Sequence, residues 1–467
     1  MISYFRSILP SRLVLLVLLF LAIRVPLILL GQPATSQELI SMLVGERLTN
    51  GFQMYAEVYD NTAPLAALFY WMIDIVTGRS VIAYRLVATM LLLLQAFFFN
   101  TTLNRHQVYA EKNYLPALIY LILGSITYEF DMLTPLLIGN TFIILSLPYI
   151  ITISREGLDN SRLFVGGFMF GLAALSYLPL LLFLLAGTFA VIFFASNTFR
   201  SFLLMVCGFV FPYAMLMTYY LYAGSLDEFI VLHLLRSWLY QTTLLLSPAD
   251  LVKVLALPAL LWLLSVFSMM SLPQRLVFQV KFQQLMWVWM AVGLLVAFTQ
   301  ASVSAGAFVL ILPAIAYFSE FFFTGGLKKW ILNTVFFAVL AGVVILRYRD
   351  VSGINRFLQI NDAKLLASAN PVPAIRNTTV LVLGNDLSYY TNNKPATPYL
   401  NWQLAQRHFG NLNEYWALFE IQENFRKESP AYIVDKAGLM EELKYKLPTV
   451  FASYEETETA AVYKKRR

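Results

Sequence analysis

Long runs of apolar residues dominate the first three quarters of the chain. A membrane-spanning helix needs about 20 apolar residues. Eight such runs cover residues 13–31, 81–100, 133–154, 201–223, 252–271, 284–300, 305–323 and 329–347. Shorter runs cover 64–78, 114–126, 162–177 and 178–196, and Pro179 separates the last two, because proline ends or breaks a helix. The pattern predicts a polytopic α-helical membrane protein with about 11–13 transmembrane helices.

Basic residues set the expected orientation of these spans. Arg6 and Arg12 precede the first span, and cytoplasmic loops carry an excess of Lys and Arg. The N-terminus is therefore expected in the cytoplasm, and the loop 31–63, with a net charge of −3, on the outer side. Lys328 and Lys329 indicate that the last span begins inside and delivers the remaining chain outside. This orientation requires an odd number of spans, 11 or 13.

The chain after residue 350 follows a different pattern. Charged side chains number 34 in residues 1–350 and 26 in the much shorter stretch 351–467. Strands are predicted at Thr378–Gly384, Ala431–Asp435 and Ala460–Lys464, and helices at Leu400–Phe409, Leu412–Arg426 and Ala437–Tyr445. The sequence thus predicts a transmembrane domain over 1–350 and a small soluble α/β domain over 351–467.

Two mixed segments interrupt the apolar runs. Within the loop 31–63, residues 36–50 have the spacing of an amphipathic helix at a membrane interface, and Gly51 follows as a helix-ending glycine. The second segment, 224–251, contains Glu228 and Arg236 among other polar residues. We expect both segments on the outer side of the membrane.

Composition narrows the function classes. Hydrophobic residues make up 59% of the chain and charged residues 13%, far fewer charges than in soluble domains. The net charge of +6 comes without a basic stripe, which argues against nucleic-acid binding. Cys207 is the one cysteine, and His106, His233 and His408 lack the spacing of zinc ligands. No glycine-rich phosphate loop occurs.

The stretch Gly51–Pro64, GFQMYAEVYDNTAP, resembles the first external loop of the GT-C membrane glycosyltransferases, which include protein mannosyltransferases and aminoarabinose transferases. In that family the loop follows roughly the pattern G-x-x-x-Y-x-D/E-x-x-D-N-x-x-P-L. Arg24-Val25-Pro26, Gly78-Arg79-Ser80 and the tail segment Val380–Tyr399 are also similar to family members.

The resemblance implies transfer of a sugar from a polyprenyl-phosphate donor to an acceptor at the outer membrane face. An acceptor hydroxyl needs a general base, for which Glu38 and Asp60 are the candidates. The leaving phosphate needs a cation, for which Arg24 and Arg236 are the candidates, or a divalent metal. Tyr55 and Glu57 are two further candidates, which we expect to line the cavity of the active site. The implied partners are the lipid-linked donor and membrane lipids, and the implied location is a bacterial-type inner membrane with a periplasmic tail.

The chain departs from the family at one place. Members carry an Asp, often Asp-Glu, at the start of the external helix, where this chain has Thr35-Ser36-Gln37-Glu38. Glu38 also suits the first turn of a helix capped by Ser36, Asp60 suits a turn, and Arg24 suits contact with lipid headgroups. Asp74, inside an apolar run, is expected to pair with a nearby arginine.

Two other function classes stay open at this point. The first is a non-catalytic scaffold that keeps the fold and binds a membrane protein or lipid partner in an envelope complex. The second is a transporter, which would be expected to show internal repeats and charges at the bilayer midplane. No repeat is visible, and the polar residues gather in the external segments.

Overall fold

The computed structural model describes residues 2–151, 160–194, 198–235, 243–270, 276–300, 302–372 and 374–466. The chain divides into two compact units, each built from segments that are distant in the sequence. Unit 1 contains Met1–Gln32, Ile82–Thr218 and Tyr240–Lys364, and unit 2 contains Pro33–Val81, Tyr219–Leu239 and Leu365–Arg467. The tail therefore shares a compact unit with residues of both predicted external segments.

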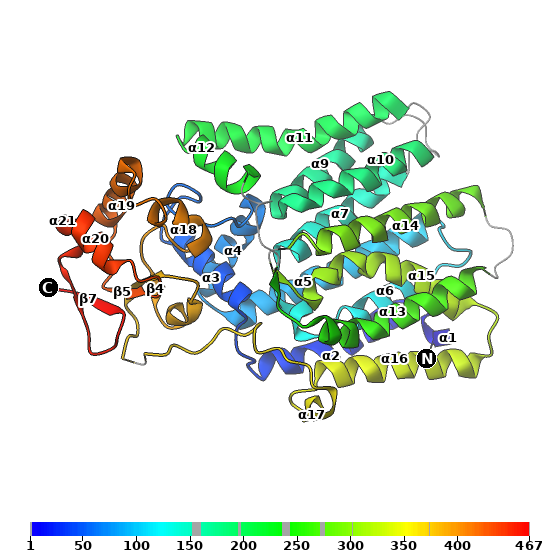
Figure 1. The fold of residues 1–467 in the computed structure, drawn as a ribbon. Coiled ribbons are helices and arrows are strands. Elements are labelled where there is room, and N and C mark those ends of the chain that lie inside the picture. The colour runs from blue at the N-terminus through cyan, green and yellow to red at the C-terminus, as the bar shows by residue number, and fades with distance from the viewer. Residues whose placement is uncertain are drawn as a thin grey trace. The chain divides into compact units, whose positions relative to one another are not determined.

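Unit 1 is helical, and its long helices run nearly parallel to one another in Figure 1. Its helices are α1 (Ile2–Phe5), α2 (Pro10–Leu29), α5 (Val81–Arg105), α6 (Leu115–Leu123), α7 (Pro135–Ile151), α9 (Asn160–Ser176), α10 (Phe183–Phe194), α11 (Thr198–Tyr222), α13 (Pro248–Met270), α14 (Val277–Ala297), α15 (Leu312–Thr324), α16 (Lys329–Arg347) and α17 (Asn355–Leu358). Short 3-10 turns cover Tyr128–Asp131 (η1), Leu178–Leu182 (η2) and Ala305–Ile311 (η5), and β1 (Thr243–Leu244) pairs with β2 (Ser302–Val303).

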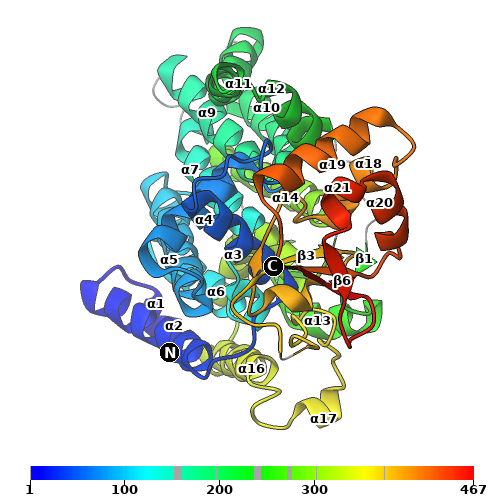
Figure 2. The same ribbon diagram turned by 90° about the vertical axis from the view of Figure 1, so that its left-hand side faces the viewer.

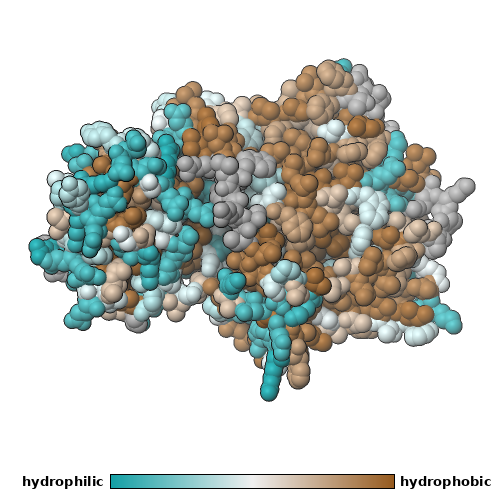
Figure 3. All heavy atoms as spheres, viewed as in Figure 1, coloured by the Kyte–Doolittle hydropathy of each residue, from teal (hydrophilic) through white to brown (hydrophobic). Residues whose placement is uncertain are grey.

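Seven helices of the described residues are long and apolar enough to cross a membrane. They match seven of the eight long runs in the sequence, and α7 occupies the eighth with 17 described residues. Their outward surface is largely hydrophobic in Figure 3; Met90 is 71% exposed and Phe267 69%. Apolar side chains in this number need lipid around them, so the chain is a multi-pass membrane protein, as predicted.

Proline and glycine shape the bundle where the sequence indicated. The break predicted at Pro179 is confirmed, because α9 ends at Ser176 and a 3-10 turn separates it from α10. Glycines let α9 approach α11: a Cβ at Gly167 would lie 1.9 Å from the carbonyl oxygen of Met205, and one at Gly208 would lie 2.1 Å from that of Phe164. Small residues at such contacts allow the close backbone approach on which membrane helices depend.

Unit 2 combines a five-stranded sheet with helices. Its helices are α3 (Ser36–Thr49), α4 (Pro64–Thr77), α12 (Leu226–Phe229), the π-helical turn η3 (Ile230–Leu235), the 3-10 turn η6 (Leu387–Tyr390), α18 (Trp402–Phe409), α19 (Tyr415–Lys427), α20 (Met440–Lys446) and α21 (Pro448–Phe451). Its strands are β3 (Thr379–Leu383), β4 (Lys394–Pro395), β5 (Tyr432–Asp435), β6 (Tyr454–Glu456) and β7 (Val462–Lys465).

The sheet has the order β4-β3-β5-β7-β6. Strand β3 is parallel to β4 and β5, whereas β7 is antiparallel to β5 and β6. Helices α18 to α21 gather beside β3 in Figure 2, and their apolar side chains share one core with Leu381, Leu383 and Ile433 of the sheet. The three predicted strands and three predicted helices of the tail are confirmed; β4 and β6, two and three residues long, are too short to show a pattern.

Helix α3 occupies the predicted external helix. Thr35, not Ser36, is its N-cap residue. Gly51 adopts a φ of +89°, and the backbone N–H of Phe52 returns to the carbonyl of Arg47 at 3.2 Å, which is how a glycine ends a helix. Arg47, a charged residue of this helix, is buried and forms an ion pair with Glu428 of the tail at 2.8 Å. The helix is therefore packed within unit 2 on more sides than an amphipathic surface helix would be.

The contacts of helix α4 correct its assignment as a short span. Just before it, Asn401 of the tail donates to Asp60 at 3.2 Å; just after it, Arg79 donates to the carbonyl of Asn393 at 3.0 Å. Both ends of the helix are thus bound by one short polar stretch of the tail, so α4 lies along that stretch and does not cross a membrane. The number of spans and their orientation stay predictions.

Candidate functional site

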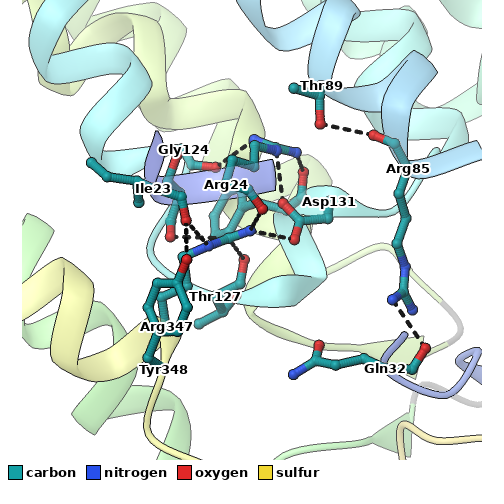
Figure 4. A network of polar contacts seen from close by, with 12 residues as sticks. Ile23, Arg24, Gln32, Arg85, Thr89, Gly124, Thr127, Asp131, Arg347 and Tyr348 are labelled. Carbon is teal, nitrogen blue, oxygen red and sulfur yellow. Dashed lines mark hydrogen bonds and ion pairs between the residues drawn. The ribbon is translucent and has the colours of Figure 1, made fainter. Parts of the chain in front are cut away.

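Arg24 lies in a buried charge cluster of unit 1, at the end of α2 (Figure 4). Its Nε is 2.7 Å from Oδ1 of Asp131, and Arg347, at the end of α16, places Nη2 2.7 Å from Oδ2 of the same carboxylate. All three side chains are at most 2% exposed. One aspartate thus joins two arginines that come from distant parts of the sequence.

The remaining donors of this cluster bind backbone carbonyls. Arg24 donates to Gly124 at 3.1 Å and to Phe130, and Arg347 donates to Ile23 at 3.0 Å and to Arg24 at 3.1 Å. Buried charges are tolerated when they are paired and hydrogen-bonded, and these contacts account for both guanidinium groups. The arrangement holds the ends of α2 and α16 together, and it differs from the headgroup contact that the sequence also allowed for Arg24.

Neighbouring charges are also engaged. Glu129, on the same 3-10 turn as Asp131, accepts the backbone N–H of Gly306 at 3.0 Å, and burial raises the pKa of its carboxyl. In unit 2, Arg79 lies 3.5 Å from Glu46. The sequence predicts that Asp74 pairs with Arg79 or Arg85; its carboxylate interacts with Arg79 through the Coulomb interaction, while the ion pair of Arg79 goes to Glu46.

Glu38 closes a capping box at the start of α3. Its Oε2 accepts the backbone N–H of Thr35 at 2.9 Å, and its own N–H donates to the hydroxyl of Thr35 at 3.1 Å. The carboxylate is 3% exposed. A capping box satisfies two N–H groups that a helix start leaves without partners, so Glu38 has a structural role whatever else it does.

Asp60 and Tyr55 lie inside the same folded loop. Oδ2 of Asp60 accepts the N–H of Thr62 at 2.9 Å and its hydroxyl, and Oδ1 accepts Asn401. Tyr55 is fully buried and donates its hydroxyl to the carbonyl of Thr62 at 2.7 Å. Glu57 accepts the N–H of Gln53 at 2.9 Å. These contacts shape the loop and attach it to the tail.

An aromatic cluster connects the two external segments within unit 2. The ring of Tyr55 lies 5.6 Å from Tyr220, 5.7 Å from Phe229 and 6.3 Å from His233. Phe229 and His233 are stacked at 5.3 Å, and burial lowers the pKa of His233 to about 3. Described residues of 31–63 and 224–251 thus pack against each other within unit 2, whereas their expected place on the outer side stays a prediction.

A cavity of about 160 Å³ opens beside this cluster. We call it the cup. Its lining comes from Tyr59 of the first external segment, Glu228 and Leu232 of the second, and Leu404, Arg407, His408, Trp416, Phe419 and Glu420 of helices α18 and α19. The cup is the place in unit 2 where the external segments and the tail present polar and aromatic side chains to open space.

The floor of the cup is rigid. His408 is 5% exposed and its Nδ1 lies 3.1 Å from the hydroxyl of Tyr399. The ring of Tyr59 packs edge-on against His408 at 5.6 Å, and Asn424 donates to the hydroxyl of Tyr399 at 3.0 Å. Burial, followed by the nearby carboxylates Glu420 and Glu228, raises the pKa of Tyr59. The tyrosine is therefore a neutral wall of the cup.

Sequence reasoning missed most of the cup. Glu228 stood in the second external segment without an assigned role, and His408 was considered only as a metal ligand. Arg407, Trp416 and Glu420 lie in two of the helices predicted for the tail and had no assigned role. A signal was present: Trp416, Phe419 and Glu420 share one face of α19 at helical spacing, and a tryptophan on the polar face of a helix is unusual.

The structure gives no position for two of the predicted site components, Arg236 and a divalent metal. Arg236 lies outside the described residues. No group of three or more His, Cys, Asp or Glu side chains able to hold a metal ion occurs within the described residues.

Models of known protein families give no match, and neither do curated protein sequences. Among solved structures, ArnT from Cupriavidus metallidurans bound to undecaprenyl phosphate aligns over 97% of this chain and 98% of that chain, at 13% identity and a TM-score of 0.55. The oligosaccharyltransferase of Archaeoglobus fulgidus in its apo form aligns over 95% of this chain and 72% of that chain, at 11% identity and a TM-score of 0.45.

The chain therefore shares the fold of ArnT, which is a GT-C glycosyltransferase. The particular likeness is to ArnT, an aminoarabinose transferase, and it runs through both the helical bundle and the tail, since nearly all of each chain is aligned. The resemblance that the sequence suggested is confirmed for the fold.

Proposed function

We propose that this protein transfers a sugar from a polyprenyl-phosphate-linked donor to an acceptor at the outer face of a bacterial-type inner membrane, with unit 2 in the periplasm. The observation that carries the proposal is the fold shared with ArnT, a protein solved with undecaprenyl phosphate bound. The orientation predicted from Arg6, Arg12, Lys328 and Lys329 supports the outer face.

In this proposal Asp60 is the preferred general base. Its carboxylate accepts hydrogen bonds from Thr62 and Asn401, and an ionised carboxylate offers about four acceptor positions, so it can still accept a proton from a hydroxyl. Glu38 is the second candidate, held by its capping box. The donor phosphate needs a cation, and Arg236 serves in this role because Arg24 is committed to Asp131.

The test is a transfer assay with full-length protein in lipid nanodiscs and a synthetic polyprenyl-phosphate hexose. The proposal expects release of polyprenyl phosphate and a glycosylated acceptor. Asp60→Asn and Arg236→Ala should each lower the rate by about 100-fold, the scale on which a general base or a charge-stabilising group acts. Full activity in an Asp60→Asn, Glu38→Gln double variant would remove both carboxylates from the mechanism.

A second function is favoured by one observation. Glu38 and Asp60 are both buried and engaged in local hydrogen bonds, a state that suits a non-catalytic scaffold which keeps the fold for binding a lipid or protein partner. Tight binding of polyprenyl-phosphate hexose without any transfer, across a panel of saccharide acceptors, would favour this alternative.

A further inference from the structure

The cup of unit 2 has the shape and chemistry of a binding site, and the loop that carries Asp60 contributes one wall of it through Tyr59. Its walls come from three segments of the chain and surround about 160 Å³. That volume is on the scale of one small ring. The ligand class therefore follows from the side chains that face this space.

Two of these side chains are exposed aromatic rings on one helix. Trp416 is 42% exposed and Phe419 is 50% exposed, and both line the cup from α19. Aromatic side chains that line a cavity together with a few polar groups are typical of ligand sites. They offer flat apolar surfaces on which the C–H face of a ring can be buried.

Three charged side chains complete the rim. Arg407 lies 5.7 Å over the Trp416 ring, and Glu228 and Glu420 stand near the wall formed by Tyr59. Among the interactions between described residues, no ion pair or side-chain hydrogen bond engages either carboxylate. Charged groups that border a cavity with no partner are available to a ligand, in contrast to the paired charges of unit 1.

We propose that the cup binds a single neutral pyranose ring. Such a ring presents an apolar C–H face, which suits Trp416 and Phe419, and several hydroxyl groups. A carboxylate accepts hydrogen bonds from hydroxyls and a guanidinium donates to their oxygens, which suits Glu228, Glu420 and Arg407. Two carboxylates against one arginine leave a net negative rim, which disfavours phosphates and acidic sugars.

As a saccharide-binding site the cup does not depend on sugar transfer. Its use as the place where a saccharide acceptor docks does rest on the proposed function. The two statements can be separated, because binding is measured without any lipid-linked donor and transfer is measured with one.

The experiment uses full-length protein in nanodiscs, free of sugar-based detergent, and isothermal titration with methyl glucoside, methyl mannoside, methyl galactoside and glucuronic acid. At least one neutral hexoside should bind, and glucuronic acid should bind less well. Trp416→Ala should weaken binding of that hexoside about ten-fold, and Glu420→Gln by several-fold. The neighbours Tyr415→Ala and Glu423→Gln, which lie on α19 but do not line the cup, should bind like the wild type.

The proposal is overturned if none of the neutral hexosides binds, or if Trp416→Ala and Glu420→Gln bind as tightly as their control variants. Binding with the expected variant pattern but no transfer in the donor assay would leave the cup established and reject the proposed enzyme. Transfer in the donor assay without saccharide binding at the cup would support the proposed enzyme and reject the cup as a saccharide site.

Discussion

The buried charge cluster of unit 1 and the cup of unit 2 use the same residue types in opposite ways. In the cluster, Asp131 lies 2.7 Å from each of Arg24 and Arg347, and carbonyl oxygens take further N–H groups. In the cup, Glu228, Glu420 and Arg407 border open space beside aromatic rings. Satisfied charges hold a fold together, whereas charges left beside a cavity are available for binding.

This comparison changes which arginine and which carboxylates deserve a functional assignment. Arg24 lies at a position where the family resemblance favours a phosphate ligand, but its guanidinium is already occupied by Asp131 and two carbonyls. Glu420, which the sequence did not single out, faces a cavity. Location in a family pattern is thus weaker evidence for function than the partners that a side chain already has.

The largest expected effect comes from breaking the cluster. Asp131→Asn would leave two buried guanidinium groups without their shared counter-charge, and losing one partner of a buried ion pair costs about 3–5 kcal/mol. We expect a much lower thermal unfolding midpoint of the full-length protein. The control is Lys253→Ala, which removes a half-exposed pair with Asp250 and should cost about 1 kcal/mol or less. Equal losses in the two variants would contradict a structural role for the cluster.

The helices of the bundle and the helices and strands of the tail could be predicted because each depends on a pattern of residues that are neighbours in the sequence. Apolar runs of about 20 residues located the spans, the break at Pro179 followed from proline chemistry, and Gly51 followed from its helix-ending position. The error at α4 has the same origin. Its residues are as apolar as a short span, and only the contacts of Asp60 and Arg79 with the tail reveal that both ends lie on one side.

A smaller effect is expected from pH at the aromatic cluster beside the cup. Burial lowers the pKa of His233 from 6.5 to about 3, so the folded protein keeps this histidine neutral while the unfolded chain takes up a proton below pH 6.5. Stability should be independent of this group above pH 6.5 and fall by about 1.4 kcal/mol per pH unit below it, which amounts to about 2 kcal/mol at pH 5.

The check is the unfolding midpoint of wild type and His233→Gln at pH 7.5 and pH 5. The variant should be less stable at the higher pH, because the packing against Phe229 changes, but it should lose less on acidification than the wild type. The same loss on acidification in both proteins would show that another group causes it.

The smallest effect separates the two roles of Glu38. Thr35→Ala removes the N-cap hydroxyl and should cost about 1 kcal/mol of stability. Glu38→Gln keeps a capping box, since glutamine also serves at this position, so stability should hardly change. A loss of transfer in Glu38→Gln at wild-type stability would identify a catalytic carboxylate. Wild-type transfer in that variant would leave Glu38 as a capping residue only.

The candidate site was harder to predict than the fold because its residues meet only in three dimensions. Arg24 precedes Asp131 by about a hundred residues and Arg347 by more than three hundred, and no local pattern links them. The cup likewise takes Tyr59, Glu228 and Glu420 from three separate segments. The sequence showed which segments carry polar residues, and the structure shows which of those residues meet.

The measurement that tests this account most directly compares Asp131→Asn and Glu420→Gln in one set of full-length preparations. The unfolding midpoint and the dissociation constant for the best-bound neutral hexoside are measured for both variants. The account predicts opposite results: Asp131→Asn lowers the midpoint and keeps the dissociation constant, while Glu420→Gln keeps the midpoint and raises the dissociation constant several-fold. Two results would contradict the account. One is a loss of saccharide binding by Asp131→Asn at temperatures below its unfolding midpoint. The other is a Glu420→Gln variant that loses stability but binds the hexoside as tightly as the wild type.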